Sequence, residues 1–209
     1  MQWLQAAAFT LWGAAVSRAE VIAFALALWM VFCNLRVNPL GWPLAMASSA
    51  LYALLFADSR LYGEALLQLV FIAAAGWGWW QWLRGTQSDG HALQVRHLSR
   101  RGLALLLGAT LTAWPLAGWL LARTTDSDVP WADAFTTVAS LAGQWLLGRK
   151  YVQNWPTWLL VNVASVALFA FKGLWLTVVL YAVFAVLSAV GWLRWARMAR
   201  SPQGLATAA

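Results

Sequence analysis

Seven long apolar segments joined by polar connections constrain the fold of this chain more than any other feature. They cover residues 21–35, 43–57, 62–83, 102–122, 134–147, 155–171 and 174–193. A helix needs about 20 apolar residues to cross a hydrocarbon core of about 30 Å, and most of these segments reach or approach that length. Only 10% of all residues are charged, against roughly 25% in soluble domains. The sequence therefore predicts an all-α integral membrane protein with seven transmembrane helices in a single membrane domain, residues 1–209.

Two of the segments, 21–35 and 134–147, are short for a span, so we expect flanking residues to extend their helices. The apolar stretch 3–16 precedes them without a basic leader and runs directly into more apolar sequence. It does not resemble a cleavable signal peptide, and it is too short to span. We expect an interfacial or partly embedded segment there.

The positive charge is distributed between the apolar segments. The net charge is +7, but Lys and Arg do not cluster on one amphipathic element, which argues against a nucleic-acid partner. Cytoplasmic loops of membrane proteins carry the excess of Lys and Arg. That rule predicts an outer N-terminus and a cytoplasmic C-terminus. The residues placed inside are Arg36, Arg84, Arg96, Arg100, Arg101, Arg149, Lys150, Arg194, Arg197 and Arg200, and those outside are Arg18, Arg60, Arg123 and Lys172.

An internal repeat appears when Trp42-Pro43 is placed over Trp155-Pro156, an offset of 155 − 42 = 113 residues. The same offset pairs Gly78-Trp79 with Gly191-Trp192 and Trp82 with Trp195. The sequence thus predicts two three-helix repeats, residues 20–83 and 133–196, separated by a cytoplasmic loop, 84–101, and a linker helix, 102–122. Each repeat crosses the membrane three times, so one extra crossing by the linker helix gives the two repeats the same orientation. In transporters with parallel repeats, the substrate lies between the repeats near the midplane.

Polar side chains within a bilayer are costly and are therefore candidates for function. On the fifth span, Thr137, Ser140 and Gln144 recur at spacings of three and four, so they share one helical face. We expect Gln144 to serve the pathway or a ligand, with interhelical hydrogen bonding as the alternative. For Thr137 and Ser140 we expect packing.

A second set of polar positions is related by the repeat. Glu64 and Gln68 share a face of the third span, and Thr177 and Tyr181 hold the equivalent positions on the seventh. Glu64 lies near the outer boundary, where a solvated or salt-bridged carboxylate is an equal alternative. On the sixth span, Asn162 is a candidate for a ligand or gate contact. Its repeat partner is Ser49, near Tyr52 on the second span.

The 17 Trp residues do not all indicate a ligand site, because Trp residues at the bilayer interface ordinarily anchor a membrane protein. We assign this belt role to Trp3, Trp79, Trp80, Trp82, Trp192 and Trp195. Trp145, beside Gln144, and Trp42 and Trp155, which open the second and sixth spans, are candidates for stacking on a flat aromatic ligand. Core packing is an equally good reading for these three.

The sequence holds no constellation typical of an enzyme. His91 and His97 both lie in the polar loop, no residues show metal-ligand spacing, and no catalytic triad or glycine-rich phosphate motif is present. We therefore expect no enzymatic activity and no cofactor.

Several motifs, in order along the chain, resemble the PnuC family of vitamin transporters. They are the run 61–68, the tryptophan-rich run 76–80, the run 144–151 followed by Asn154-Trp155, and the run 172–177 followed by Leu180-Tyr181. The resemblance covers residues 20–197. It implies a 3+1+3 arrangement similar to the SWEET proteins, a homotrimer, and residence in the bacterial inner membrane.

The resemblance also implies a substrate class and a mode of transport. Members carry nicotinamide riboside, and relatives carry thiamine or riboflavin. Transport is by facilitated diffusion, with a cytoplasmic kinase trapping the vitamin by phosphorylation. Thiamine or riboflavin remain alternatives here, because Ala164, Ser165, Phe169 and Trp175 depart from the family pattern. A membrane subunit without transport activity is the alternative from another class.

Overall fold

Each apolar segment forms a helix in the computed structural model, which describes residues 6–11, 14–58, 62–87, 90–125, 129–171 and 175–200. The seven predicted helices are confirmed within these ranges. Their bounds are α2 Arg18–Leu35, α3 Gly41–Asp58, α4 Tyr62–Arg84, α5 Arg100–Thr124, α6 Pro130–Gly148, α7 Asn154–Phe171 and α8 Trp175–Met198.

The two short segments are extended at their N-terminal ends, as the membrane thickness requires. Helix α2 begins at Arg18 and α6 at Pro130, which gives them 18 and 19 residues. Pro130 occupies the first turn of α6, where a missing N–H costs nothing and the fixed φ favours the helix. At a rise of about 1.5 Å per residue, both helices reach about 27 Å, close to the thickness of a hydrocarbon core.

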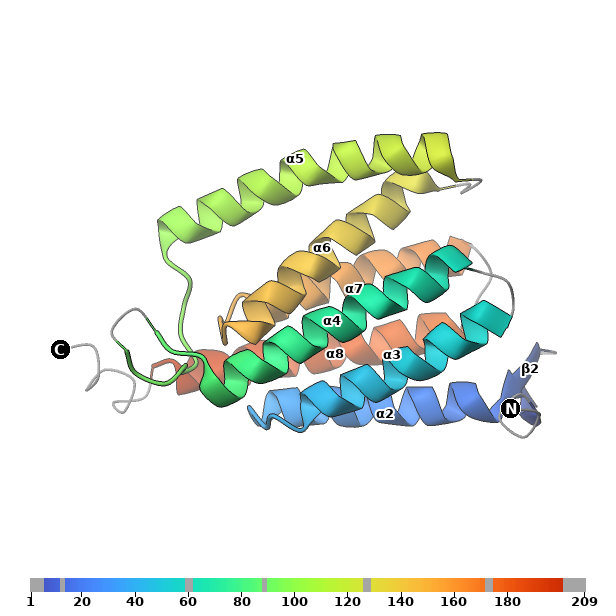
Figure 1. Cartoon of the computed structure of the whole chain (residues 1–209), viewed down its shortest axis with the longest axis horizontal. Coiled ribbons are helices and arrows are strands. Elements are labelled where there is room, and N and C mark those ends of the chain that lie inside the picture. Colours follow the sequence, from blue (N-terminus) through green and yellow to red (C-terminus); the bar gives the residue numbers. More distant parts are fainter. Residues whose placement is uncertain are drawn as a thin grey trace. The chain divides into compact units, whose positions relative to one another are not determined.

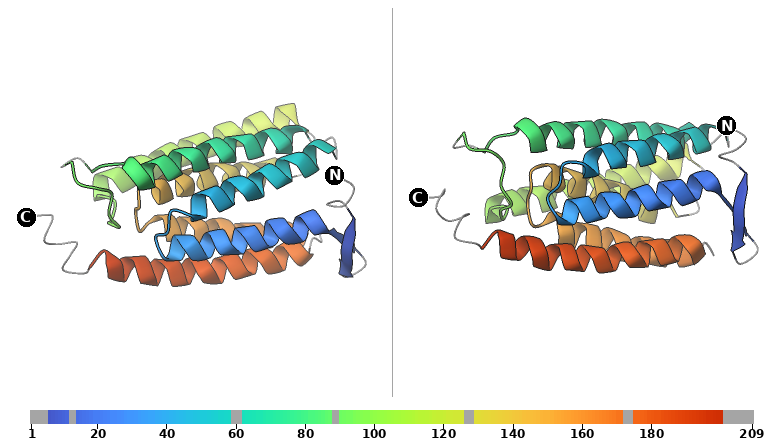
Figure 2. Two further views of the ribbon diagram at one scale, coloured as in Figure 1. Left: turned by 60° about the horizontal axis from the view of Figure 1, so that its bottom comes forward. Right: turned by 90° about the horizontal axis from the view of Figure 1, so that it is seen from below.

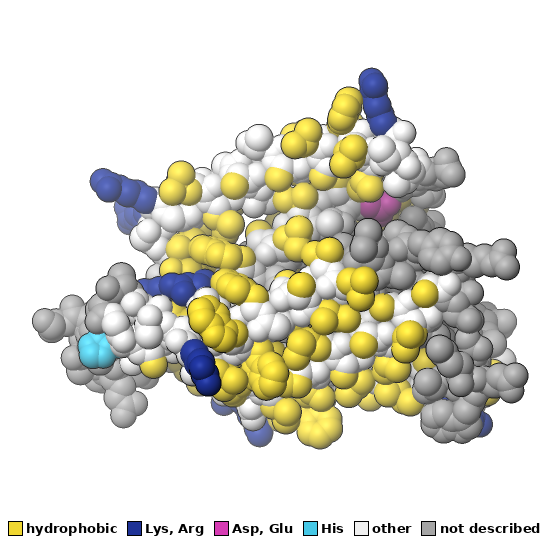
Figure 3. All heavy atoms as spheres, in the orientation of Figure 1, with side chains coloured by type: hydrophobic (Ala, Val, Ile, Leu, Met, Phe, Trp, Pro, Cys, Tyr) yellow, Lys and Arg dark blue, Asp and Glu magenta, His cyan; other side chains and the backbone are white. Residues whose placement is uncertain are grey.

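The surface is apolar in the way that a lipid environment selects. By length and composition, three of the described helical segments are long and apolar enough to cross a membrane: Arg100–Thr124, Asn154–Phe171 and Val178–Met198. Large hydrophobic side chains are widely exposed, such as Leu105 and Leu116 on α5. In the view of Figure 3, hydrophobic side chains lie along the helices, and Lys and Arg lie toward the helix ends. This is the reverse of a soluble surface.

A small β-hairpin precedes the helices and was not part of the all-α prediction. Strand β1, Ala7–Leu11, pairs antiparallel with β2, Ala14–Ser17, with an irregularity between Ala7 and Phe9. The Arg18 N–H donates to the Ala6 carbonyl at 3.1 Å, so the hairpin leads directly into α2. The interfacial segment expected for residues 3–16 is therefore strand-forming where it is described. The hairpin pairs the backbone groups that its two strands turn toward each other.

The chain divides into two compact units, residues 1–86 and 87–209. In the first unit α2 packs on α3 and α3 on α4; in the second, α5 packs on α6, α6 on α7 and α7 on α8. Figures 1 and 2 show that helices adjacent in sequence run antiparallel within each unit. Short connections between helices enforce this antiparallel order.

Helix α5 is fixed to α6 by aromatic contacts near their connection. The indole N–H of Trp114 donates to the Trp131 carbonyl at 2.8 Å, and the Trp114 ring meets the edge of Phe135 with centroids 5.4 Å apart. Gly118 is buried beneath the Trp131 ring, where a Cβ would collide with two ring atoms and press on a third. These contacts hold α5 to the second unit although most of its surface is exposed.

Each unit contains a Trp–Gly–Trp cluster, formed in the first by Trp42, Gly78 and Trp82. The Trp42 ring lies over Gly78 and meets Trp82 edge to face, with centroids 5.5 Å apart. In the second unit Trp155 lies over Gly191 and meets Trp195 at 5.6 Å. The members of the two clusters are equivalent at the offset of 113 residues.

These clusters correct part of the belt assignment. Trp79, Trp80 and Trp192 are exposed, as a belt requires, but Trp82 and Trp195 are buried. A glycine stands four residues before each of these two tryptophans and leaves room for an indole from the neighbouring helix. That indole covers the buried Trp. The belt assignment was therefore wrong for these two residues, while Trp3 lies outside the described part of the chain. Spacing along one helix cannot reveal a partner ring from another.

The α2–α3 and α6–α7 turns have the same backbone geometry. Val37 and Lys150 stand at equivalent positions with positive φ, 55° and 56°. Val37 N–H donates to Asn34 O, and Lys150 N–H to Leu147 O. The next amide in each turn reaches back five residues, from Asn38 to Cys33 and from Tyr151 to Leu146. This pattern ends a helix through a left-handed residue, a conformation that favours glycine.

Replacing Val37 with glycine should stabilise the protein. A β-branched side chain in the left-handed region costs about 1 kcal/mol or more, and glycine removes that cost. We expect a rise of about 2–4 °C in the thermal midpoint of the detergent-solubilised protein. Val21→Gly, on an exposed position within α2, is the control and should lower the midpoint. Equal losses in both variants would contradict the strain at Val37.

Candidate functional site

The polar stripe of α6 lies partly inside the second unit. Ser140 is buried, and Thr137 and Gln144 are half-buried. Beside them, Gly143 lets the Trp158 ring of α7 approach closely, since a Cβ there would touch it. The stripe therefore turns toward α7 at this level.

Asn162 forms the buried polar contact between α7 and α8. It is 4% exposed, and its side-chain amide Nδ2 donates to Ser188 Oγ at 3.1 Å. The Ser188 hydroxyl donates in turn to the Phe184 carbonyl one turn earlier, at 2.8 Å. Ser165, one turn beyond Asn162, is also buried. Asn162 thus joins α7 to α8 through its amide N–H, and its carbonyl oxygen is left as a further acceptor.

Tyr181 belongs to an aromatic group in the N-terminal part of α8. Its ring stacks on Phe169 of α7, with centroids 5.2 Å apart, and meets Phe184 edge to face at 6.1 Å. Offset and edge-to-face pairs of this kind each contribute about 0.5–1.5 kcal/mol beyond burial. Tyr181 is thus held in place within the second unit, seven residues and two turns from Ser188.

The candidates in the first unit are half-buried where the structure describes them. Ser49 and Tyr52 lie on α3, and Gln68 lies on α4. Ser48 is buried instead, and its hydroxyl donates to the Ala23 carbonyl of α2 at 3.3 Å, joining two helices. The side chains of Glu64 and Thr177 lie outside the described part of the chain.

Trp145 and Trp155, the two aromatic candidates on α6 and α7, have different environments. Trp145 is 41% exposed, and its ring lies 5.7 Å from that of Tyr151, tilted by 36°. Trp155 is enclosed by Gly191 and Trp195, which favours packing over ligand stacking. Of these two indoles, that of Trp145 is therefore the accessible one, and it lies one residue from Gln144.

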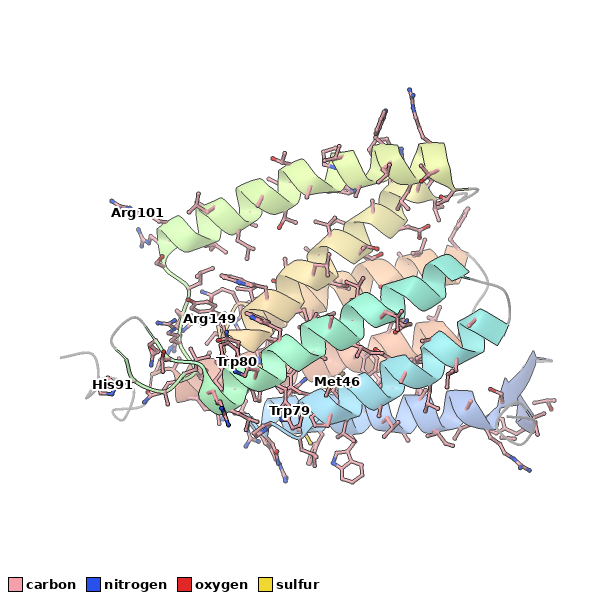
Figure 4. The ribbon with its side chains drawn as sticks, in the orientation of Figure 1. Met46, Trp79, Trp80, His91, Arg101 and Arg149 are labelled. Atoms are coloured by element: carbon pink, nitrogen blue, oxygen red, sulfur yellow. The ribbon has the colours of Figure 1, made fainter. Side chains whose placement is uncertain are left out.

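The turn after α6 carries two positively charged residues, Arg149 and Lys150. Burial lowers the pKa of the Lys150 ammonium, because desolvation disfavours the charged form. Its Nζ donates to the Leu93 carbonyl at 3.0 Å, which draws the polar loop onto this turn. Figure 4 labels Arg149 beside it, at the end of α6. The described residues hold no group of three or more His, Cys, Asp or Glu side chains that could bind a metal ion.

Two features of this region were missed by sequence reasoning. Ser188 was not singled out, although its spacing of seven from Tyr181 puts both on one face of α8. The contact between the polar loop and the α6–α7 turn was not predicted either, because it joins residues 55 apart by single hydrogen bonds. No periodic pattern in the sequence predicts such a contact.

Comparison with known proteins places the chain among transporters. Residues 17–197 match the family model described as nicotinamide mononucleotide transporter. The riboflavin/roseoflavin transporter RibM of Streptomyces davaonensis is 28% identical over 202 residues, covering 93% of each chain. The nicotinamide riboside transporter PnuC of Escherichia coli is 28% identical over 149 residues, covering 60% of this chain and 62% of that protein.

A solved structure shares the fold. The crystal structure of a protein described as the vitamin B3 transporter PnuC matches with a TM-score of 0.70 and 20% sequence identity. The match covers 87% of this chain and 81% of that chain.

Proposed function

This chain belongs to the nicotinamide mononucleotide transporter family, whose members include PnuC, and on that premise we propose that it carries nicotinamide riboside across a membrane by facilitated diffusion. It is a membrane transporter of the vitamin type and not an enzyme.

The observation that carries the substrate proposal is the accessible Trp145 ring beside the Gln144 amide on α6. The nicotinamide ring of the riboside is a flat cation, and a cation over an indole gains about 0.5–2 kcal/mol. The ribose needs hydrogen-bonding groups, which Gln68, Gln144 and Asn162 offer. Ser49, Tyr52, Thr177, Tyr181 and Glu64 complete the proposed site.

Riboflavin is the second candidate, because RibM matches this chain over nearly its full length. Its flavin ring is larger and uncharged, so it would gain the stacking but not the cation–π attraction at Trp145. Thiamine, with a cationic ring, is the third. A membrane subunit without transport activity has less support, because the family is one of transporters.

We further propose that the helices form two parallel three-helix repeats joined by α5, similar to the SWEET proteins. The bounds of α2, α3 and α4 coincide with those of α6, α7 and α8 to within one residue at the offset of 113. The equivalent Trp–Gly–Trp clusters and the left-handed residues of the two turns support the same relation. Parallel repeats would bring the candidate residues to a shared site near the midplane.

The proposed topology puts the N-terminus outside and the C-terminus in the cytoplasm of a bacterial inner membrane, since this orientation leaves most of the Lys and Arg inside. The proposed oligomer is a homotrimer. Facilitated diffusion cannot accumulate its substrate, so we propose that a cytoplasmic kinase phosphorylates the vitamin and prevents its exit.

Uptake into liposomes tests the substrate and the mode of transport together. Purified protein in liposomes should equilibrate radiolabelled nicotinamide riboside to the outside concentration, with no response to imposed sodium or proton gradients. Excess unlabelled nicotinamide riboside should compete, and riboflavin and thiamine should not. Protein-free liposomes give the background. Competition by riboflavin alone would transfer the proposal to that vitamin, and no uptake of any of the three would reject transport of this class.

A further inference from the structure

The polar loop before α5 is bound tightly to the turn between α6 and α7. Leu93 and Val152 are buried, one on each side of this contact. The Leu98 N–H donates to Gln153 Oε1 at 2.9 Å. Ser99 then caps α5 by accepting from the Gly102 N–H at 3.1 Å. The loop is therefore a structured part of the second unit.

Arg96 lies at the centre of this contact. Its backbone pairs with the turn in a parallel bridge: the Arg96 N–H donates to Lys150 O at 3.2 Å, and the Val152 N–H donates to Arg96 O at 2.9 Å. Its guanidinium donates from Nη1 to Gln87 Oε1 and from Nη2 to the Tyr151 hydroxyl, both at 3.1 Å. Backbone and side chain thus bind different partners.

Tyr151 contacts Arg96 through both its hydroxyl and its ring, and its ring also contacts Trp145. The Arg96 Cζ also lies 5.0 Å from the centroid of the Tyr151 ring, a cation–π distance. The Tyr151 ring also contacts the ring of Trp145, with centroids 5.7 Å apart. A continuous chain of contacts therefore runs from Gln87 through Arg96 and Tyr151 to the accessible indole of α6.

We propose that Arg96 is a positioning residue for substrate binding: it fixes the orientation of the Tyr151 ring, and Tyr151 in turn limits the rotamers of Trp145. The proposal rests on the function proposed above, in which Trp145 stacks on the substrate ring. A ring held in one orientation loses less entropy on binding than a free one. Affinity should therefore depend on a loop residue that does not touch the substrate.

The backbone bridge allows the side chain to be tested separately from the loop. The Arg96 backbone bonds and the burial of Leu93 and Val152 remain when the guanidinium is removed, so Arg96→Met should keep the loop in place. Arg101→Met is the matched control, because Arg101 is an exposed arginine of the first turn of α5. Figure 4 shows its side chain pointing away from the neighbouring helix α6.

The expected result is a change in affinity. In liposome uptake, Arg96→Met should raise KM about threefold to tenfold with Vmax nearly unchanged, whereas Arg101→Met should leave both unchanged. Tyr151→Phe, which keeps the ring and removes only the hydroxyl, should raise KM by a smaller factor. Because it hardly alters packing, it serves in place of Arg96→Met if that variant does not yield monodisperse protein.

A double-mutant cycle with Trp145 separates positioning from general damage. The initial slope of uptake gives Vmax/KM even without saturation, so the cycle can be measured in weak variants. In the Trp145→Leu background, Arg96→Met should have no further effect, since its influence acts through the indole. Equal losses in both backgrounds, an unchanged KM in Arg96→Met, or an unchanged KM in Trp145→Leu would each overturn the inference. Wild-type protein without uptake would instead reject the proposed function.

Discussion

Replacing Gly191 with alanine should lower the thermal midpoint by about 10 °C and sharply reduce the yield of folded protein. A Cβ at position 191 would collide with three ring atoms of Trp155, and that indole is itself buried against Trp195. Overpacking of a rigid core costs about 1–3 kcal/mol, and here the ring has little space to move, so we expect the upper end of that range. Size-exclusion chromatography and thermal unfolding in detergent measure both effects.

The control for this prediction is the same substitution at Gly108 of α5. Nothing lies within 4 Å of a Cβ built there. Gly108→Ala should leave the midpoint unchanged or raise it slightly, because alanine is the better helix former by about 1 kcal/mol. Trp155→Leu should make room for the new methyl group, so the double variant with Gly191→Ala should be less destabilised than the two single effects predict. If Gly191→Ala unfolds at the wild-type temperature, the close approach of Trp155 is wrong.

Asn162→Leu should reduce the initial rate of nicotinamide riboside uptake at least about tenfold while the protein remains folded. A tenfold loss corresponds to about 1.4 kcal/mol, within the range of one hydrogen bond to a buried polar group. Leucine has the branching and the number of side-chain heavy atoms of asparagine, although it is bulkier, and it can neither donate to Ser188 nor accept from a substrate hydroxyl. Uptake per folded molecule, normalised by chromatography, is the measurement.

Ser188→Ala distinguishes a substrate contact from a bond that only joins helices. This variant removes the partner of the Asn162 amide and leaves the amide itself in place. If Asn162 contacts the substrate, Ser188→Ala should retain far more uptake than Asn162→Leu. Equal uptake in the two variants, whether lost or retained, would assign Asn162 to helix packing and remove it from the proposed site.

The helices were predictable because a bilayer imposes a simple rule on the sequence. A spanning segment must be apolar throughout and satisfy its backbone internally, so apolar runs mark the helices with few alternatives. The extension of α2 and α6 beyond their apolar runs followed from the same length requirement. The hairpin before α2 was not predicted, because an apolar run of this length fits several structures.

The candidate site was predictable only in part. The spacing of Thr137, Ser140 and Gln144 fixed their common face, but it could not say which helix that face meets. Asn162 was singled out as a ligand or gate candidate on α7, and that role stays a prediction, whereas its partner Ser188 was not singled out. Serine is common in transmembrane helices, and its hydroxyl often bonds within its own helix, so its sequence signal is weak.

The tryptophans show most clearly which features the sequence determines and which features depend on the tertiary structure. Sequence alone determined the number and order of the helices and the offset that makes Trp42 and Trp155 equivalent, because hydropathy and helical periodicity are local properties. The tertiary structure alone decided that Trp82 and Trp195 are buried, that Trp145 is accessible, and that Arg96 reaches Tyr151. Those facts depend on which side chains approach from other helices and loops, and such approaches are fixed by packing between segments distant in the chain.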